Sequence, residues 1–152
     1  ILGDSSGGGM ALAVAMVLRD RGVDPLGATV LIAPWLDISG TDPRLAEIAP
    51  TDPWLAVPGT HAAGALYRAE LSESYPLVSP IHGRLAGLGP ITLFSGTRDI
   101  LNADAYRLVA LAAASDHPLD FHEGVDMIHN WVILPMPEAV PARKLIVEAM
   151  LR

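Results

Sequence analysis

The first nine residues, Ile1-Leu2-Gly3-Asp4-Ser5-Ser6-Gly7-Gly8-Gly9, decide how the rest of the chain is interpreted. They contain the pattern Gly-x-Ser-x-Gly, in which Gly3 and Gly7 flank Ser5. Two apolar residues precede the pattern and a strongly helical run follows it, which is the context of a tight strand-to-helix turn. A serine on such a turn is held in a strained backbone conformation that points its hydroxyl outward, as a nucleophile requires. We expect both glycines to remove Cβ atoms that would collide in the turn.

The helix that follows this turn would direct its N-terminal N–H groups at a developing oxyanion, and the N–H of Ser6 is the candidate donor. Asp4 is either a buried, hydrogen-bonded supporter of the turn or a solvated turn residue. A flexible Gly/Ser loop is the alternative, because the five-residue pattern arises by chance in roughly one chain in twenty of this size. The choice between them depends on partners further along the chain.

Composition restricts the class of protein. The chain has 152 residues, of which 51% are hydrophobic and 18% charged, so it is globular and long enough to bury a core. The formal net charge of -7 argues against nucleic acid as a partner. Absence of cysteine excludes disulfides and thiolate chemistry. His61, His82 and His117 are expected at the surface without ligand-like spacing, so we expect no metal site. The longest apolar run, residues 10–18, is too short to span a bilayer.

Apolar strand-like runs alternate with helical ones along the chain. The runs without polar alternation are typical of strands covered on both faces, as in a parallel sheet. We therefore expect an α/β fold with a mostly parallel sheet and flanking helices. Helices are expected over 10–21, 60–71 (with Thr60 as N-cap), 104–115 and 137–152, and strands over 28–33, 90–95 and 118–123, the last near a sheet edge. Segments 37–58, 72–89 and 124–131 are expected to be loops or irregular, with at most short helical turns.

Two downstream residues are candidate partners of Ser5. A serine nucleophile needs a base, and the base needs a group that orients it. Asp99 follows the second of these strands and His129 follows the last, so both fall at the sheet edge where Ser5 lies. Asp104 is an alternative carboxylate, but we expect it to be a first-turn or capping residue of its helix. His122 is an alternative base, but it lies within a predicted strand, from which it could not reach Ser5.

Three ordered motifs together resemble one protein family. Gly3-Asp4-Ser5-Ser6-Gly7-Gly8, Gly-x-x-Asp-x-Leu at 96–101 and Met127-Ile128-His129 are similar to the hormone-sensitive-lipase-like branch of the α/β-hydrolases. Ser79-Pro80 followed by Leu88-Gly89-Pro90 also resembles its stretch before the acid-bearing strand. The resemblance covers essentially the whole chain. It implies that Ser5 is the nucleophile, Asp99 the orienting acid and His129 the base of a carboxylic ester hydrolase that needs no cofactor.

The resemblance also implies a substrate class. Short- to medium-chain acyl esters are expected, with lactones as the close alternative. A non-catalytic ligand-binding member of the fold, and a peptidase or amidase, are further alternatives. Trp131, two residues after the base, and Trp35 are candidates for binding the substrate, and packing is the alternative role for both. A small ester or lactone is the expected partner, a homodimer is left open, and a cytoplasmic location is expected.

Part of the family pattern is not present in residues 1–152. Members of the family carry a His-Gly-Gly-Gly-type segment upstream of the nucleophile, which supplies further oxyanion N–H groups, together with earlier strands and an N-terminal cap. We therefore expect residues 1–152 to be the C-terminal part of a single α/β-hydrolase domain. By themselves they would hold the triad and only part of the oxyanion hole, and we expect them to be poorly soluble and inactive in isolation.

Overall fold

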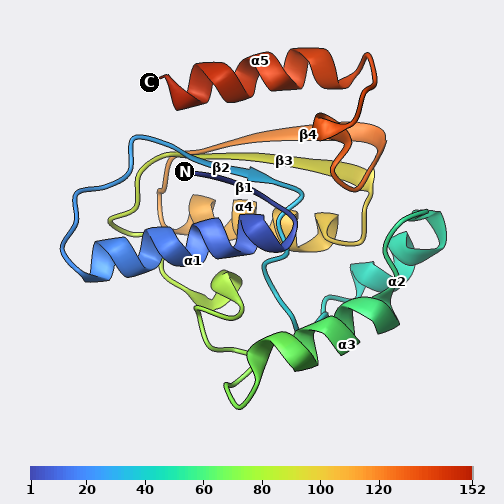
Figure 1. The fold of residues 1–152 in the computed structure, drawn as a ribbon, viewed down its shortest axis with the longest axis horizontal. Helices are drawn as coiled ribbons and strands as arrows, with labels where there is room; N and C mark the ends of the chain where they lie inside the picture. Colours follow the sequence, from blue (N-terminus) through green and yellow to red (C-terminus); the bar gives the residue numbers. More distant parts are fainter. Residues whose placement is uncertain (152) are drawn as a thin grey trace.

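A computed structural model describes residues 1–151, which form one parallel sheet with helices on both faces (Figure 1). The strands are β1 (Leu2–Asp4), β2 (Thr29–Ile32), β3 (Ile91–Arg98) and β4 (Leu119–Ile128), and they lie in the order β1-β2-β3-β4. Every pair of neighbouring strands is parallel. The α/β fold predicted from the sequence is confirmed, and β4 lies at an edge of this sheet as predicted.

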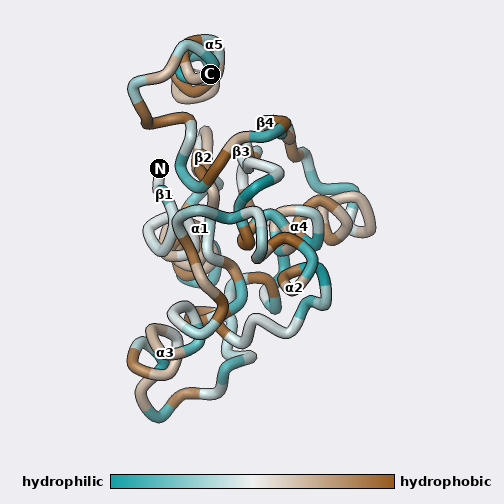
Figure 2. The backbone as a smooth tube through the Cα atoms, turned by 90° about the vertical axis from the view of Figure 1, so that its right-hand side faces the viewer, coloured by the Kyte–Doolittle hydropathy of each residue, from teal (hydrophilic) through white to brown (hydrophobic). Residues whose placement is uncertain are grey.

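The helices divide between the two faces of the sheet and a separate layer. They are α1 (Ser6–Asp20), α2 (Arg44–Ile48), α3 (Val57–Arg68), α4 (Asn102–Ala114) and α5 (Ala139–Met150), with short 3-10 turns at Ala49–Thr51, Pro80–His82 and Trp131–Ile133. Helices α1 and α4 pack on one face, and α5 lies on the other (Figure 2). The long excursion between β2 and β3 carries α2 and α3, which lie beyond α1 (Figure 1).

Each face of the sheet has its own hydrophobic core, because side chains alternate along a strand. Leu31 and Leu93 are fully buried against α1 and α4. Their neighbours Ile32 and Phe94 point the other way and pack with residues of α5. Burial on both faces explains why these strands are apolar without interruption.

Helix α1 begins at Ser6, four residues before the predicted start at Met10. Glycine has a low helix propensity, so Gly7–Gly9 were expected to precede the helix. Tertiary packing overrides that preference: a Cβ atom on Gly9 would lie 2.1 Å from the Trp35 carbonyl oxygen, and one on Gly8 would lie 2.8 Å from Pro34 Cβ. The glycines therefore allow the first turn of α1 to lie against the segment that follows β2.

Two other boundaries differ from the prediction. Strand β4 continues to Ile128, so the predicted loop over 124–131 is wrong for its first five residues. Its pairing with β3 is interrupted between Gly96 and Arg98 and resumes at Arg98 opposite Ile128, a bulge of the kind found beside active sites. Helix α3 begins at Val57 with Pro58 in its first turn, and Thr60 is not its N-cap. The predicted end of the last helix, Arg152, lies outside the described residues.

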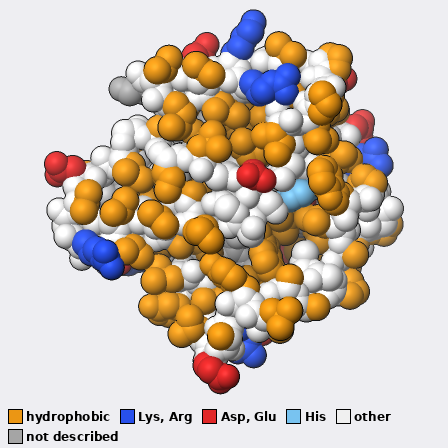
Figure 3. Space-filling view, viewed as in Figure 1, with side chains coloured by type: hydrophobic (Ala, Val, Ile, Leu, Met, Phe, Trp, Pro, Cys, Tyr) orange, Lys and Arg blue, Asp and Glu red, His pale blue; other side chains and the backbone are white. Residues whose placement is uncertain are grey.

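The outer edge of β1 is bordered by apolar side chains. Among residues 1–151, β1 pairs only with β2, and Leu2, Met10 and Val14 are exposed. Figure 3 shows hydrophobic side chains over much of the face between α5 and α1. This edge therefore presents unpaired backbone groups beside an apolar surface. No helix in the part of the chain that the structure describes is long and apolar enough to cross a membrane.

Candidate active site

Three loops meet at the carboxyl edge of the sheet. Ser5 follows β1, Asp99 follows β3 and His129 follows β4. Because the strands are parallel, their carboxyl ends lie at one edge, where α/β proteins bind their ligands. The sheet therefore brings together side chains that are up to 124 residues apart in the sequence.

Ser5 has the strained backbone of a nucleophile turn, with φ 53° and ψ -124°. The turn is held at both sides: the Ser5 N–H donates to the Ile32 carbonyl oxygen at 2.9 Å, and the Trp35 N–H donates to the Ser5 carbonyl oxygen at 2.9 Å. A Cβ atom on Gly3 would lie 2.1 Å from the Gly7 carbonyl oxygen, so Gly3 is required sterically as predicted. The same expectation for Gly7 is wrong, because its Cβ would meet no described atom within 4 Å.

The three predicted triad side chains form one hydrogen-bonded chain. His129 Nδ1 lies 2.9 Å from Asp99 Oδ2, and His129 Nε2 lies 3.0 Å from Ser5 Oγ. A carboxylate only accepts, so Nδ1–H donates to Asp99 and leaves Nε2 free to accept the Ser5 hydroxyl proton. His129 is 3% exposed and Asp99 is fully buried, so water does not compete for these contacts. The arrangement is that of a nucleophile, a base and an orienting acid.

The environment of Asp99 sets the balance of its charge. Burial raises the pKa of the Asp99 carboxyl above its ordinary value, while the hydrogen bond and charge of His129 oppose that rise. The other carboxylate oxygen, Oδ1, accepts the Leu101 N–H at 2.9 Å. The carboxylate is thus fixed in orientation by one backbone group and one imidazole.

Ser6 begins helix α1 immediately after the nucleophile. A backbone N–H at the first position of a helix has no intrahelical acceptor, and it lies at the positive end of the helix dipole. The predicted oxyanion donor therefore has the required position in the chain and in the helix. Its side chain is exposed and lines the cleft described next.

A cleft of about 420 Å³ opens beside Ser5. Trp35, one of the two predicted substrate-binding tryptophans, lines it. Trp54, Leu55 and Leu101 contribute most of its other large apolar side chains. The cleft thus offers an apolar wall next to the nucleophile, with the polar groups confined to one end.

Trp131 does not line this cleft, so the prediction of a substrate-binding role for it is wrong. It is only 7% exposed and packs in the core beneath α5. Its indole N–H donates to the Ser95 carbonyl oxygen at 3.3 Å. The reason is the 3-10 turn after His129, which directs the chain back toward the α5 face of the sheet.

Trp54 takes the place that the sequence analysis gave to Trp131. Its ring stands edge-on to the His129 imidazole, with ring centroids 5.7 Å apart at an angle of 86°, and it is 54% exposed. The signal was present in the sequence, since Trp54 interrupts a polar, proline-containing loop. Exposed aromatic residues in loops are found at binding sites more often than those within apolar runs.

Asp4 supports the histidine loop. Asn130 follows His129 in the left-handed conformation, with φ 56°, which asparagine tolerates better than most residues. Its side-chain amide donates to Asp4 Oδ2 at 3.0 Å. Asp4, which the sequence left undecided, is therefore a hydrogen-bonded link between the nucleophile turn and the loop that carries the base.

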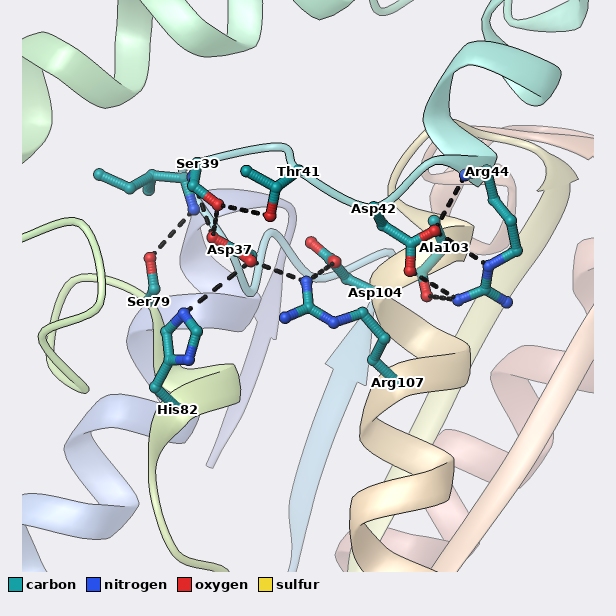
Figure 4. A network of polar contacts seen from close by, with 11 residues as sticks. Asp37, Ser39, Thr41, Asp42, Arg44, Ser79, His82, Ala103, Asp104 and Arg107 are labelled. Carbon is teal, nitrogen blue, oxygen red and sulfur yellow. Dashed lines mark hydrogen bonds and ion pairs between the residues drawn. The ribbon is translucent and has the colours of Figure 1, made fainter.

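The two alternative triad residues lie elsewhere. Asp104 lies in the first turn of α4, where Arg107 Nη1 contacts it at 2.8 Å and contacts Asp37 at 2.7 Å (Figure 4). Burial raises the pKa of Asp104 to about 6. His122 stacks on Phe94 with ring centroids 4.8 Å apart. Neither contacts His129 or Ser5. Across residues 1–151, no cluster of three or more histidine and carboxylate side chains could hold a metal ion.

Comparison with known proteins agrees with this geometry. A family model described as the alpha/beta hydrolase fold matches residues 1–133. The chain therefore belongs to the α/β-hydrolase family. It is 34% identical over 136 residues to an acetyl-hydrolase of Streptomyces hygroscopicus, covering 86% of this chain and 44% of that protein. It is 31% identical over 134 residues to a triacylglycerol lipase of Mycobacterium tuberculosis, covering 88% of this chain and 26% of that protein.

Solved structures identify the branch of the family. An esterase of the bacterial hormone-sensitive lipase family superposes with a TM-score of 0.93 at 31% identity, covering 98% of this chain and 51% of that one. An esterase/lipase from an uncultured bacterium superposes with a TM-score of 0.91 at 30% identity, covering 100% and 53%. The resemblance to the hormone-sensitive-lipase-like branch is confirmed. The chain spans about half the length of these relatives or less.

Proposed function

We propose that the protein is a serine carboxylic ester hydrolase. The observation that carries the proposal is the contact series from Ser5 Oγ to His129 Nε2 at 3.0 Å and from His129 Nδ1 to Asp99 Oδ2 at 2.9 Å. The names of the relatives, which include an acetyl-hydrolase, a triacylglycerol lipase and esterases, support the same reaction class.

In the proposed mechanism, Ser5 Oγ attacks the ester carbonyl carbon while its proton passes to His129 Nε2. The Ser6 N–H donates to the carbonyl oxygen as it becomes negative, and Asp99 stabilises the imidazolium. His129 then gives its proton to the departing alkoxide, which leaves an acyl group on Ser5. A water molecule, deprotonated by His129, attacks this acyl-enzyme and the carboxylic acid departs. No cofactor takes part in these steps.

The cleft beside Ser5 supports a substrate of modest size. Its volume of about 420 Å³ and its wall of Trp35, Trp54 and Leu55 suit a short- to medium-chain acyl or alkyl group. We further propose that residues 1–152 are the C-terminal part of a single hydrolase domain. The open edge of β1 and the half-length match to relatives support this, and further oxyanion donors would then come from outside these residues.

Substitution of Ser5 tests the proposal. In the full-length protein, Ser5→Ala should abolish hydrolysis of p-nitrophenyl butyrate and labelling by a fluorophosphonate probe, because both require the Ser5 oxygen. Ser115→Ala is the matched control, since that hydroxyl only donates to the Leu111 carbonyl oxygen at the far end of α4. Labelling that persists in Ser5→Ala would show that another serine is the nucleophile.

A further inference from the structure

A segment from the excursion between β2 and β3 docks on the turn that carries Asp99. Arg98 Nε donates to the Thr51 carbonyl oxygen at 3.1 Å. The Ile100 N–H donates to Asp52 Oδ2 at 2.9 Å, across 48 residues of sequence. Asp99 lies between these two donors, so both sides of its turn are tied to one segment.

The second oxygen of the same carboxylate holds the wall of the cleft. Asp52 Oδ1 accepts the Trp54 N–H at 2.8 Å and the Leu55 N–H at 2.9 Å. These contacts fix the backbone from which the Trp54 ring reaches the edge of the His129 imidazole. One side chain therefore connects the residue that orients the base with the aromatic ring that lies against the base.

The Asp52 carboxylate is also close enough to act on Asp99 by its charge. It adds to the effect of burial, which is the main cause of the raised pKa of Asp99. Asp52 itself is half-buried, and the hydrogen bonds of its carboxylate go to backbone N–H groups rather than to Ser5 or His129. Any effect on the reaction must therefore pass through Trp54 and the Asp99 turn.

We propose that Asp52 is a positioning residue of the hydrolase site, whose two carboxylate oxygens hold Trp54 against His129 and fix the turn that carries Asp99. This inference rests on the proposed function, since it assigns Asp52 a role in the same reaction. It predicts that loss of one Asp52 oxygen reduces turnover more than substrate binding, because the residue acts on the geometry of the triad.

The chain contains its own control for this proposal. The tripeptide Thr-Asp-Pro occurs at 41–43 and again at 51–53. Asp42 Oδ1 accepts the Arg44 N–H at 2.9 Å, just as Asp52 Oδ1 accepts the N–H two residues later. The remaining contacts of Asp42 are with the Arg44 guanidinium, away from the triad (Figure 4). Asp42→Asn therefore changes the same kind of turn without changing the contacts of the Asp99 turn.

The first test compares Asp52→Asn with Asp42→Asn in the full-length protein. Asparagine keeps one acceptor oxygen, so it cannot accept from both the Ile100 N–H and the Trp54 N–H in the observed geometry. We expect kcat/KM for p-nitrophenyl butyrate to fall about tenfold in Asp52→Asn, or about 1.4 kcal/mol, mainly through kcat. Asp52→Glu, which keeps two oxygens, should restore part of the loss, and Asp42→Asn should stay within about twofold of the wild type.

A spectroscopic measurement separates positioning from general stability. The low-field proton resonance of a histidine Nδ1–H bonded to a carboxylate reports the contact between His129 and Asp99. We expect it to shift or broaden in Asp52→Asn and to remain unchanged in Asp42→Asn. Unchanged kinetics and an unchanged resonance in Asp52→Asn would overturn the proposal.

The wild-type protein provides a test that requires no variant to fold. In an NMR pH titration the amides of Trp54, Leu55 and Ile100 should change together with one midpoint, because one carboxylate accepts from all three. The Leu101 amide, which donates to Asp99, should follow a different midpoint. Separate midpoints for Trp54 and Ile100 would overturn the proposal. Absence of ester hydrolysis in the wild type would instead refute the proposed function, since the resonance and the titration do not depend on turnover.

Discussion

Replacing Asp99 by asparagine would separate the chemical role of the buried carboxylate from its structural role. The two side chains have nearly the same shape, and the amide oxygen of the substituted side chain could still accept the Leu101 N–H. The other position would become an NH₂ group facing His129 Nδ1, where Oδ2 now accepts at 2.9 Å. An amide N–H donates, so it would require Nδ1 to accept and would move the imidazole proton to Nε2.

The size of the effect on turnover follows from that exchange. With a proton on Nε2, His129 cannot accept the proton of Ser5, although the distances change little. Loss of the correct tautomer in a serine triad costs about 10,000-fold in kcat, which is about 5 kcal/mol of transition-state stabilisation. We expect a loss of that order in Asp99→Asn, with little change in KM.

The effect on stability should have the opposite sign. Burial raises the pKa of Asp99 in the folded protein. A carboxyl with a raised pKa favours folding fully below its unfolded-state pKa, and that contribution is lost as the pH rises through the folded-state value. At pH 7.5 the ionised Asp99 therefore lowers the free energy of unfolding relative to a neutral side chain. Asp99→Asn should leave the melting temperature unchanged or raise it, as expected when a residue is kept for activity at a cost in stability.

The assay is steady-state hydrolysis of p-nitrophenyl butyrate together with thermal unfolding at pH 7.5. Asp116→Asn is a suitable control, because Asp116 is exposed, lies after α4 and has φ 51°, a conformation that asparagine accepts. Turnover by Asp99→Asn within tenfold of the wild type would refute the role of Asp99 as the orienting acid. A large fall in melting temperature with intact specific activity in the folded fraction would show that its role is structural.

Three further predictions follow from individual contacts. Gly3→Ala should lower the melting temperature strongly, since its Cβ would lie 2.1 Å from the Gly7 carbonyl oxygen, whereas Gly7→Ala should raise the free energy of unfolding by up to about 1 kcal/mol; equal effects would contradict the turn geometry. Trp54→Ala should raise KM for p-nitrophenyl hexanoate more than for the acetate, because it removes an apolar wall of the cleft, and a uniform change in KM would contradict that role. The pKa of Asp104, raised from 3.8 to about 6, means that its contribution to stability is lost as the pH rises through about 6. Asp104→Asn should therefore stabilise the protein by up to about 3 kcal/mol at pH 7.5 and not at pH 4, as measured by thermal unfolding, and a gain at both pH values would refute the argument.

The sequence predicted the layers of the fold because local patterns determine them. Uninterrupted apolar strands such as Thr29–Ile32 require cover on both faces, and that requirement follows from side-chain alternation alone. The start of α1 was missed for the opposite reason. Only the backbone of Trp35, 26 residues away from Gly9, makes the glycines suitable for a helix at that point. A local propensity cannot contain that information.

The candidate site shows the same division. Ser5, Asp99 and His129 occur in motifs at strand ends, so their meeting at one sheet edge follows from the parallel topology. The wall of the cleft does not follow from topology. Trp54 comes from a long excursion whose path depends on contacts such as that of Asp52 with the Ile100 N–H, which no periodic pattern announces. Trp131 was misassigned because a distance of two residues from the base was taken as a guide to direction, and the turn after His129 reverses that direction.

The triad loops are anchored to segments distant in sequence, and this arrangement predicts where substitutions act. Asn130 ties the His129 loop to Asp4, and Asp52 ties the Asp99 turn to the cleft wall. Each contact is a single hydrogen bond at the surface of the sheet, so its loss removes little of the buried apolar area that stabilises the fold. Catalysis has a stricter requirement, because groups displaced by about 1 Å can lose two orders of magnitude in rate. Substitutions at these anchors should therefore reduce kcat well before they reduce the melting temperature, whereas substitutions in the core, such as at Leu93, should do the reverse.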